Sequence, residues 1–124
     1  MKILVIDDSR LARRMVINQL RILKADDIHE ANDGGEALNF LSTNEDTVLI
    51  FLDWNMPGQN GLLVLKKIKS DPKLKHIEVI MVTSEHNKSH ILDAIASGAC
   101  DFIAKPFTPE VFIDKIKPRL ASLS

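Results

Sequence analysis

Residues 48–53 read VLIFLD, a run of five apolar side chains that ends in an aspartate. An apolar run of this length without alternation is typical of a parallel strand that is covered on both faces. Two further runs have the same character, ILVI at residues 3–6 and VIMV at residues 79–82. The sequence therefore predicts a parallel sheet that is buried between two outer layers.

Two weaker runs, at residues 28–31 and 102–104, complete the expected set of strands. Segments with helical character lie between the strands and after the last one. They cover residues 11–24, 36–41, 60–71 and 91–98, and a fifth begins at Thr108 and Pro109. Because strand and helix alternate throughout, we expect right-handed crossovers and an open, doubly wound α/β sheet.

Two helix boundaries have specific expectations. Asp8 or Ser9 is expected to cap the first helix, because both side chains accept hydrogen bonds from the free N–H groups of a first turn. Pro118 conflicts with the pattern of the last helix, since a proline inside a helix removes one hydrogen bond and clashes with the preceding turn. We expect a kink or a helix end at Pro118.

The overall composition limits the class of protein. A chain of 124 residues is the size of one globular domain, and we expect residues 1–124 to form one. The net charge of -1 provides no field that draws the chain to nucleic acid or anionic lipid, and the apolar runs are too short to span a membrane. Cys100 is the only cysteine, and the N-terminus has no signal-peptide pattern, so we expect a cytoplasmic location.

Polar side chains follow four of the apolar runs, where the expected strands end. They are Asp7 and Asp8 after the first run, Asp53 after the third, Thr83 and Ser84 after the fourth, and Lys105 after the fifth. Taken singly, each has an ordinary interpretation as a helix cap, a turn residue or a solvated charge. Because ligands of open α/β sheets bind beyond the carboxyl ends of the strands, the predicted fold brings these groups to one rim.

The acidic groups at this rim need a counter-charge. Two ionised carboxylates 4 Å apart repel each other by about 4 kcal/mol at an effective dielectric constant near 20. Protonation would relieve the repulsion, but Mg²⁺ or Mn²⁺ would do so more completely, because these hard cations prefer oxygen ligands. Asp53 could then act as a nucleophile toward a phosphoryl group whose oxygens are held by Lys105 and Thr83.

Four segments together carry a family likeness. They are DD at 7–8, LDWNMP at 52–57 with NG at 60–61, VTSE at 82–85, and KPFT at 105–108. In these segments, and over essentially its whole length, the chain resembles the receiver domain of bacterial two-component response regulators, and most of all the single-domain chemotaxis regulators. The resemblance implies a flavodoxin-like fold, with three layers and a five-stranded parallel sheet in the order 2-1-3-4-5.

The same resemblance implies a function and a set of partners. The protein would be a monomeric switch that accepts a phosphoryl group from a histidine kinase and catalyses only its own phosphotransfer and dephosphorylation. It would act on a downstream protein through the face formed by the fourth helix, the fifth strand and the fifth helix, and not on nucleic acid or membrane.

The resemblance also implies which residues form the metal site. Asp53 would be the phosphoacceptor and a metal ligand, Asp8 a direct ligand, and Asp7 a ligand mainly through water. The main-chain carbonyl of Asn55 would be a further ligand. Asn60 stands where the family usually has an aspartate, and either residue can cap a helix.

Further positions match family residues that bind the phosphoryl group or respond to it. Thr83 and Lys105 would bind the group, and Thr83 together with Phe102 would form the switch. Phe102 lacks the hydroxyl of the tyrosine that is common in chemotaxis regulators. Asn55 and Glu85 match positions that tune the rate of dephosphorylation, in a pairing that implies a short-lived phosphoryl state.

Two rival functions are consistent with the same acidic cluster. A hydrolase of the haloacid dehalogenase type also forms a phosphoaspartate on an α/β sheet, but it needs a second carboxylate two residues after the nucleophile, where this chain has Asn55. The other rival is a binding module that is never phosphorylated.

Overall fold

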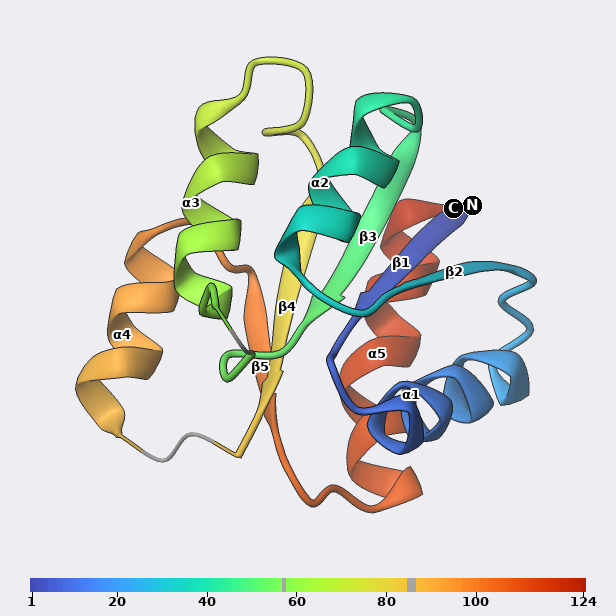
Figure 1. Ribbon diagram of the computed structural model, residues 1–124. Helices are drawn as coiled ribbons and strands as arrows, with labels where there is room; N and C mark the ends of the chain where they lie inside the picture. Colours follow the sequence, from blue (N-terminus) through green and yellow to red (C-terminus); the bar gives the residue numbers. More distant parts are fainter. Residues whose placement is uncertain (57, 85–86) are drawn as a thin grey trace.

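The computed structural model describes residues 1–56, 58–84 and 87–124 (Figure 1). The strands are β1 (Lys2–Ile6), β2 (Asp27–Ala31), β3 (Thr47–Leu52), β4 (Glu78–Thr83) and β5 (Asp101–Ala104). The helices are α1 (Arg10–Ile22), α2 (Gly34–Ser42), α3 (Gly61–Ser70), α4 (Lys88–Ala96) and α5 (Pro109–Leu123). All five predicted strands are therefore confirmed, with boundaries that differ by one residue at most at either end of each strand.

The strands form one five-stranded sheet in the order β2-β1-β3-β4-β5, and each neighbouring pair is parallel. Helices α2, α3 and α4 cover one face of this sheet, and α1 and α5 cover the other (Figure 1). The predicted three-layer fold and strand order are confirmed. Strand β2 lies on one side of β1 and strand β3 on the other, so the strand order reverses at β1. Folds of this kind bind ligands at such a reversal, beyond the carboxyl ends of the strands.

Two hydrophobic cores explain why the three central strands contain continuous apolar runs. In β1, Leu4 and Ile6 point into the core under α2, α3 and α4, whereas Ile3 and Val5 point into the core under α1 and α5. Side chains of successive strand residues point to opposite faces, so a strand between two cores needs an apolar residue at each position. The continuous run that predicted a buried strand has this physical cause.

Side-chain caps fix the start of two helices near the rim. Ser9, and not Asp8, caps α1: its hydroxyl accepts a hydrogen bond from the N–H of Ala12 at 3.1 Å. Asn60 caps α3 by accepting from the N–H of Leu63 at 3.0 Å. Because Ser9 takes the capping role, the carboxylate of Asp8 is left exposed at the rim.

Helix α5 continues through Pro118 to Leu123, so the helix end considered at this proline does not occur. Ile116 and Leu120 lie on either side of Pro118 and are both buried in the core under α1 and α5. Burial of one such side chain contributes about 1.5–3 kcal/mol, which offsets the local cost of a helix proline, about 3 kcal/mol. Among the residues described, the structure contains no helix with the length and apolar character needed to cross a membrane.

Candidate functional site

Three aspartates lie at the carboxyl end of the sheet, directly after strands β1 and β3. Asp7 and Asp8 follow β1, and Asp53 follows β3, its neighbour. Main-chain hydrogen bonds extend the ladder past the strands, because the N–H of Asp7 donates to the Ala31 carbonyl at 3.2 Å and that of Asp53 to the Ile6 carbonyl at 3.0 Å. Main-chain hydrogen bonds therefore hold the ends of β1 and β3 in register at Asp7 and Asp53.

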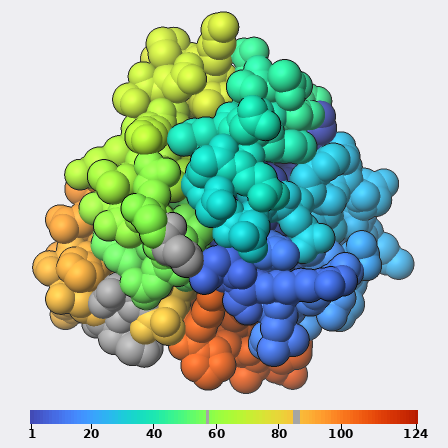
Figure 2. Space-filling view, in the orientation of Figure 1, coloured from blue at the N-terminus to red at the C-terminus, as the bar shows by residue number. Residues whose placement is uncertain are grey.

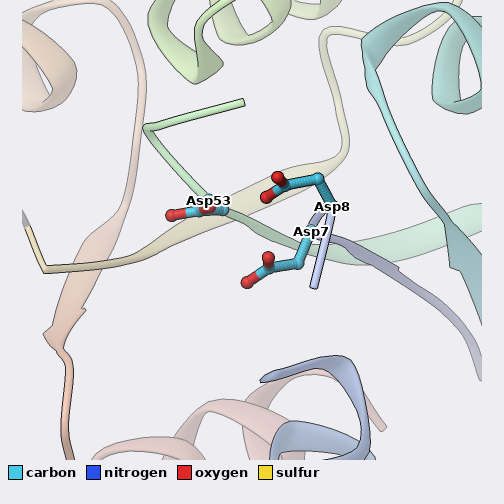
Figure 3. A group of neighbouring side chains, drawn as sticks. All are labelled: Asp7, Asp8 and Asp53. Atoms are coloured by element: carbon cyan, nitrogen blue, oxygen red, sulfur yellow. The ribbon is translucent and has the colours of Figure 1, made fainter. Parts of the chain in front are cut away.

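The three carboxylates converge (Figure 3). One oxygen from each of Asp7, Asp8 and Asp53 lies within 4.8 Å of the others. Asp7 and Asp53 are buried, with 5% and 6% of their surface exposed, whereas Asp8 is exposed. The cluster is thus closed toward the protein and open to solvent on the side of Asp8.

Lys105, which follows β5, brings a positive charge into this cluster. Its Nζ lies 2.6 Å from Asp7 Oδ2 and 3.6 Å from Asp53 Oδ1. Only 24% of the Lys105 side chain is exposed, so the two ion pairs are partly shielded from water. The lysine and the acidic residues that the sequence predicted to meet do so, although Lys105 and Asp7 are 98 positions apart.

Thr83 is the last residue of β4 and is 2% exposed. In the β4–β5 ladder it pairs with Ala104, and its carbonyl accepts a hydrogen bond from the N–H of Lys105 at 2.9 Å. These contacts place Thr83 and Lys105 on adjacent strand ends at the same rim as the aspartates.

The surroundings of Asp53 change its acidity. Burial and the negative charge of Asp7 raise the pKa of Asp53 from 3.8 to about 6, while the charge of Lys105 and a hydrogen bond with the Asn55 main chain oppose the rise. The carboxylate therefore carries a charge near neutral pH at a free-energy cost, because burial disfavours the charged form. A second cation in the cluster would reduce that cost.

The donor set fits a hard divalent cation. It consists of carboxylate oxygens from three residues, one of which, Asp8, is exposed so that water can complete a coordination shell. Mg²⁺ usually binds proteins through one or two carboxylates and keeps several waters, and Mn²⁺ accepts the same oxygen donors. Asp7, Asp8 and Asp53 could hold such an ion.

Two other predicted residues, Asn55 and Phe102, are among the described ones. Asn55 is exposed in the segment between β3 and α3. Phe102 is half-buried on β5, and Lys115 Nζ lies 4.7 Å from the centre of its ring. Glu85, which the resemblance associated with dephosphorylation, lies outside the described residues.

Gly61, one of the residues that carry the family likeness, supports the site through a close approach to the main chain of Asp53. Its N–H donates to the Trp54 carbonyl at 2.7 Å, and a Cβ atom at this position would collide with the main-chain carbonyl of Asp53. Only glycine allows α3 to begin this close to the strand end that carries Asp53. Its place directly after the Asn60 cap was one available signal.

Comparison with known proteins agrees with this geometry. The family model described as the response regulator receiver domain matches residues 3–117. Chemotaxis protein CheY1 of Helicobacter pylori is 44% identical over 117 residues, which is 94% of this chain and 94% of that protein. A CheY homolog of Campylobacter jejuni is 42% identical over 122 residues, covering 98% of this chain and 94% of the relative.

Solved structures show the same fold. Chemotaxis protein CheY4 of Vibrio cholerae superimposes with a TM-score of 0.84 at 29% identity, covering 94% of this chain and 96% of that one. A putative two-component system response regulator/GGDEF domain protein reaches 0.88 at 27% identity over 99% of this chain. The match spans only 50% of that longer protein.

Proposed function

The chain belongs to the response regulator receiver domain family, and we propose that it is a switch in which Asp53 accepts a phosphoryl group from a histidine kinase. The observation that carries the proposal is the position of Lys105 Nζ, 2.6 Å from Asp7 and 3.6 Å from Asp53. An acidic cluster alone could serve many purposes. Transfer of a phosphoryl group needs a nucleophile and a positive charge near the phosphoryl oxygens. The buried carboxylate of Asp53 and the ammonium group of Lys105 would supply them.

The proposed reaction is a single displacement at phosphorus. An oxygen of the ionised Asp53 carboxylate attacks, the bond from phosphorus to the donor imidazole breaks, and the electron pair of that bond leaves with the donor. The product is an acyl phosphate. Because the pKa of Asp53 is about 6, most of the residue is ionised and nucleophilic near neutral pH.

The chain's own residues orient and neutralise the phosphoryl group. Lys105 and Thr83 lie on adjacent strand ends, where the ammonium and the hydroxyl would bind two of its oxygens. Mg²⁺, when bound by Asp7, Asp8, Asp53 and the carbonyl of Asn55, would supply positive charge to a further oxygen. Asn55 and Glu85 are proposed to set the lifetime of the product.

The proposed output surface is the face of α4, β5 and α5. Exposed apolar side chains lie on it, with Leu92 at 61%, Ile95 at 48% and Val111 at 47% exposure. Modification of Asp53 would favour one of two arrangements of Thr83 and Phe102, and thereby change this face for a downstream protein.

The remaining parts of the proposal concern the state of the protein. We infer that residues 1–124 form a monomeric receiver domain in the cytoplasm, that its downstream partner belongs to chemotaxis-type signalling, and that it catalyses no reaction except its own phosphorylation and dephosphorylation. Burial raises the pKa of the Cys100 thiol, which favours its protonated, less nucleophilic form.

Acetyl phosphate with Mg²⁺ tests the proposal directly. The intact protein should gain the mass of one phosphoryl group, the gain should map to Asp53, and chelation of the metal or the Asp53→Asn change should abolish it. Asp114→Asn, which changes an exposed aspartate of α5, is the matched control and should react like the unmodified chain.

Two additional assays separate the rival functions. Continuous release of phosphate from several small phosphate esters by catalytic amounts of protein would favour the hydrolase. Absence of any modification at Asp53, with both acetyl phosphate and a phosphorylated kinase as donors, would favour the unphosphorylated binding module.

A further inference from the structure

Arg13, in the first turn of α1, joins the acidic cluster to β2. Its Nη1 donates to the main-chain carbonyl of Asp7 at 2.6 Å and to Asn32 Oδ1 at 3.2 Å, and its Nε donates to Glu30 Oε1 at 2.9 Å. Only 12% of the side chain is exposed. One guanidinium group therefore fixes the end of β1, the end of β2 and the start of α1 to one another.

The carbonyl that Arg13 holds belongs to the peptide group between Asp7 and Asp8. Because a peptide group is planar, fixing its oxygen also fixes the direction in which the chain leaves toward Asp8. The N–H of Asp7 is held at the other end by the Ala31 carbonyl at 3.2 Å. These two contacts, one to β2 and one to α1, therefore fix the main-chain positions from which the side chains of Asp7 and Asp8 extend.

The side chain of Asp7 has its own contacts, which a bound cation would change. Asp7 Oδ1 accepts the N–H of Ser9 at 2.9 Å, and Asp7 Oδ2 accepts Lys105 Nζ at 2.6 Å. A divalent cation in the cluster would compete for the oxygen that Lys105 now holds. The contact from Arg13 is directed at the main chain, so binding of a cation by the side chain of Asp7 would not require it to break.

Figure 2 shows that the start of α1, in dark blue, lies directly against the cyan segment at the start of α2. Arg13 and its partners Glu30 and Asn32 span this junction. Among the described residues, no other side chain donates a hydrogen bond to the Asp7 carbonyl. Loss of the guanidinium would leave that carbonyl without this partner at a partly buried position.

We propose that Arg13 is a positioning residue for the acidic cluster: it holds the peptide between Asp7 and Asp8 so that the two carboxylates and Asp53 meet at one cation. The inference rests on the proposed function, because it assumes that the cluster binds a divalent cation. An arginine suits this role and a lysine does not, since the planar guanidinium offers several donors in fixed directions. The guanidinium of Arg13 donates to the Asp7 main chain, to Glu30 and to Asn32, and among the described residues to none of the three carboxylates of the cluster.

Binding of Mn²⁺, followed by the loss of its free-ion signal in electron paramagnetic resonance, tests the proposal without any reaction. Arg13→Met should weaken Mn²⁺ binding by about 10-fold or more. Loss of a residue that orients metal ligands typically lowers metal affinity by at least this factor. Arg13→Lys should restore only part of the affinity. Arg14→Met, which changes the exposed neighbour on the same helix, should leave the affinity unchanged.

Two further measurements distinguish positioning from a general loss of stability. In metal-free Arg13→Met, the amide proton of Ser9, bound to Asp7 Oδ1, should exchange faster, while amides of the distant strand pair β4 and β5 should keep their rates. With acetyl phosphate, the Mg²⁺ concentration for half-maximal modification of Asp53 should rise in proportion to the lost affinity. The rate at saturating Mg²⁺ should stay close to that of the unmodified chain.

The outcomes separate this inference from the proposed function. Equal Mn²⁺ affinity in Arg13→Met and the unmodified chain overturns the role of Arg13 and leaves the phosphoacceptor untouched. Absence of Mn²⁺ binding in the unmodified chain overturns both. If Arg13→Met does not fold, Glu30→Gln replaces it as a test. Glu30→Gln retains the contact of Arg13 with Asp7 but removes the charged partner of Nε, so it should weaken Mn²⁺ binding less than Arg13→Lys does. An equal or larger loss of affinity contradicts the proposal.

Discussion

Lys105 Nζ lies 2.6 Å from Asp7 Oδ2, a full ångström closer than its 3.6 Å distance to Asp53 Oδ1. The ammonium group therefore pairs mainly with Asp7 and leaves Asp53 less fully compensated. A divalent cation bound in the cluster would compete with Lys105 for the same carboxylate oxygens.

Replacement of Lys105 by methionine should therefore tighten metal binding. The change removes a positive charge from the cluster while keeping most of the side-chain volume, and we expect affinity for Mn²⁺ to rise by about 10-fold, or 1.4 kcal/mol. The same variant should still become phosphorylated by acetyl phosphate, but phosphorylation should no longer change binding of a downstream partner. Lys117→Met, at an exposed position of α5, is the control for loss of a lysine charge. Weaker Mn²⁺ binding in Lys105→Met would contradict the competition.

The stability of the metal-free protein should depend on the ionisation of Asp53. Its pKa is raised from 3.8 to about 6, so folding favours the protonated form. The unfolding free energy should therefore fall as the pH rises from about 4 to about 6, and the ionised residue should cost about 3 kcal/mol near neutral pH.

Urea denaturation of Asp53→Asn against the unmodified chain, in the presence of a chelator, measures this cost. The variant should be the more stable protein at about pH 7, and the difference should vanish at about pH 4. Addition of Mg²⁺ should stabilise only the unmodified chain. A pH-independent difference between the two proteins would show that Asp53 titrates normally.

The contact between Gly61 and Asp53 predicts a specific intolerance to a methyl group. Gly61→Ala should lower the unfolding free energy by about 1–3 kcal/mol, because the new Cβ forces the Asp53 carbonyl to move. Phosphorylation of Asp53 should slow as well. Gly35→Ala is the matched control. Among the described residues, a Cβ there meets only Asp33 Oδ1 at 3.5 Å, so the higher helix propensity of alanine should raise stability by about 0.5–1 kcal/mol.

Phe102 and Lys115 form a pair that holds the ring in place. Lys115 Nζ lies 4.7 Å from the ring centre and also donates to the Phe102 carbonyl at 2.7 Å. A double-mutant cycle with Phe102→Leu and Lys115→Met should give a coupling energy of about 0.5–1 kcal/mol, the size of an exposed cation–π contact. Urea denaturation provides the four free energies. A coupling energy of zero would show that the ring is held by packing alone.

Several features of the fold could be predicted from local sequence. The runs at residues 3–6, 48–52 and 79–82 indicated central strands because a strand between two cores needs an apolar side chain at each position. Asp53 and Lys105 could be placed at the rim by the same reasoning, since each directly follows a run. Their meeting required that the strands be parallel, so that their carboxyl ends lie at one edge of the sheet, although β4 separates β3 from β5.

Pro118 shows where local reasoning was insufficient. A helix end at this residue was a reasonable expectation from backbone chemistry, but Ile116 and Leu120 are buried on either side of it and hold the helix against the sheet. Packing of this kind depends on residues far away in the chain. The sequence around Pro118 therefore does not show which distant residues pack against this helix.

The order of apolar runs and the polar residues after them were sufficient to determine the parallel sheet, its rim and the acidic, hydroxyl and basic groups gathered there. Only the tertiary structure decided that Lys105 pairs more closely with Asp7 than with Asp53, that Gly61 lies against the Asp53 carbonyl, and that Arg13 holds the Asp7 carbonyl. Periodicity and strand-end position are local properties that a pattern can reveal. Which donor reaches which oxygen depends on side-chain packing between separate segments, and a difference of one ångström decides it.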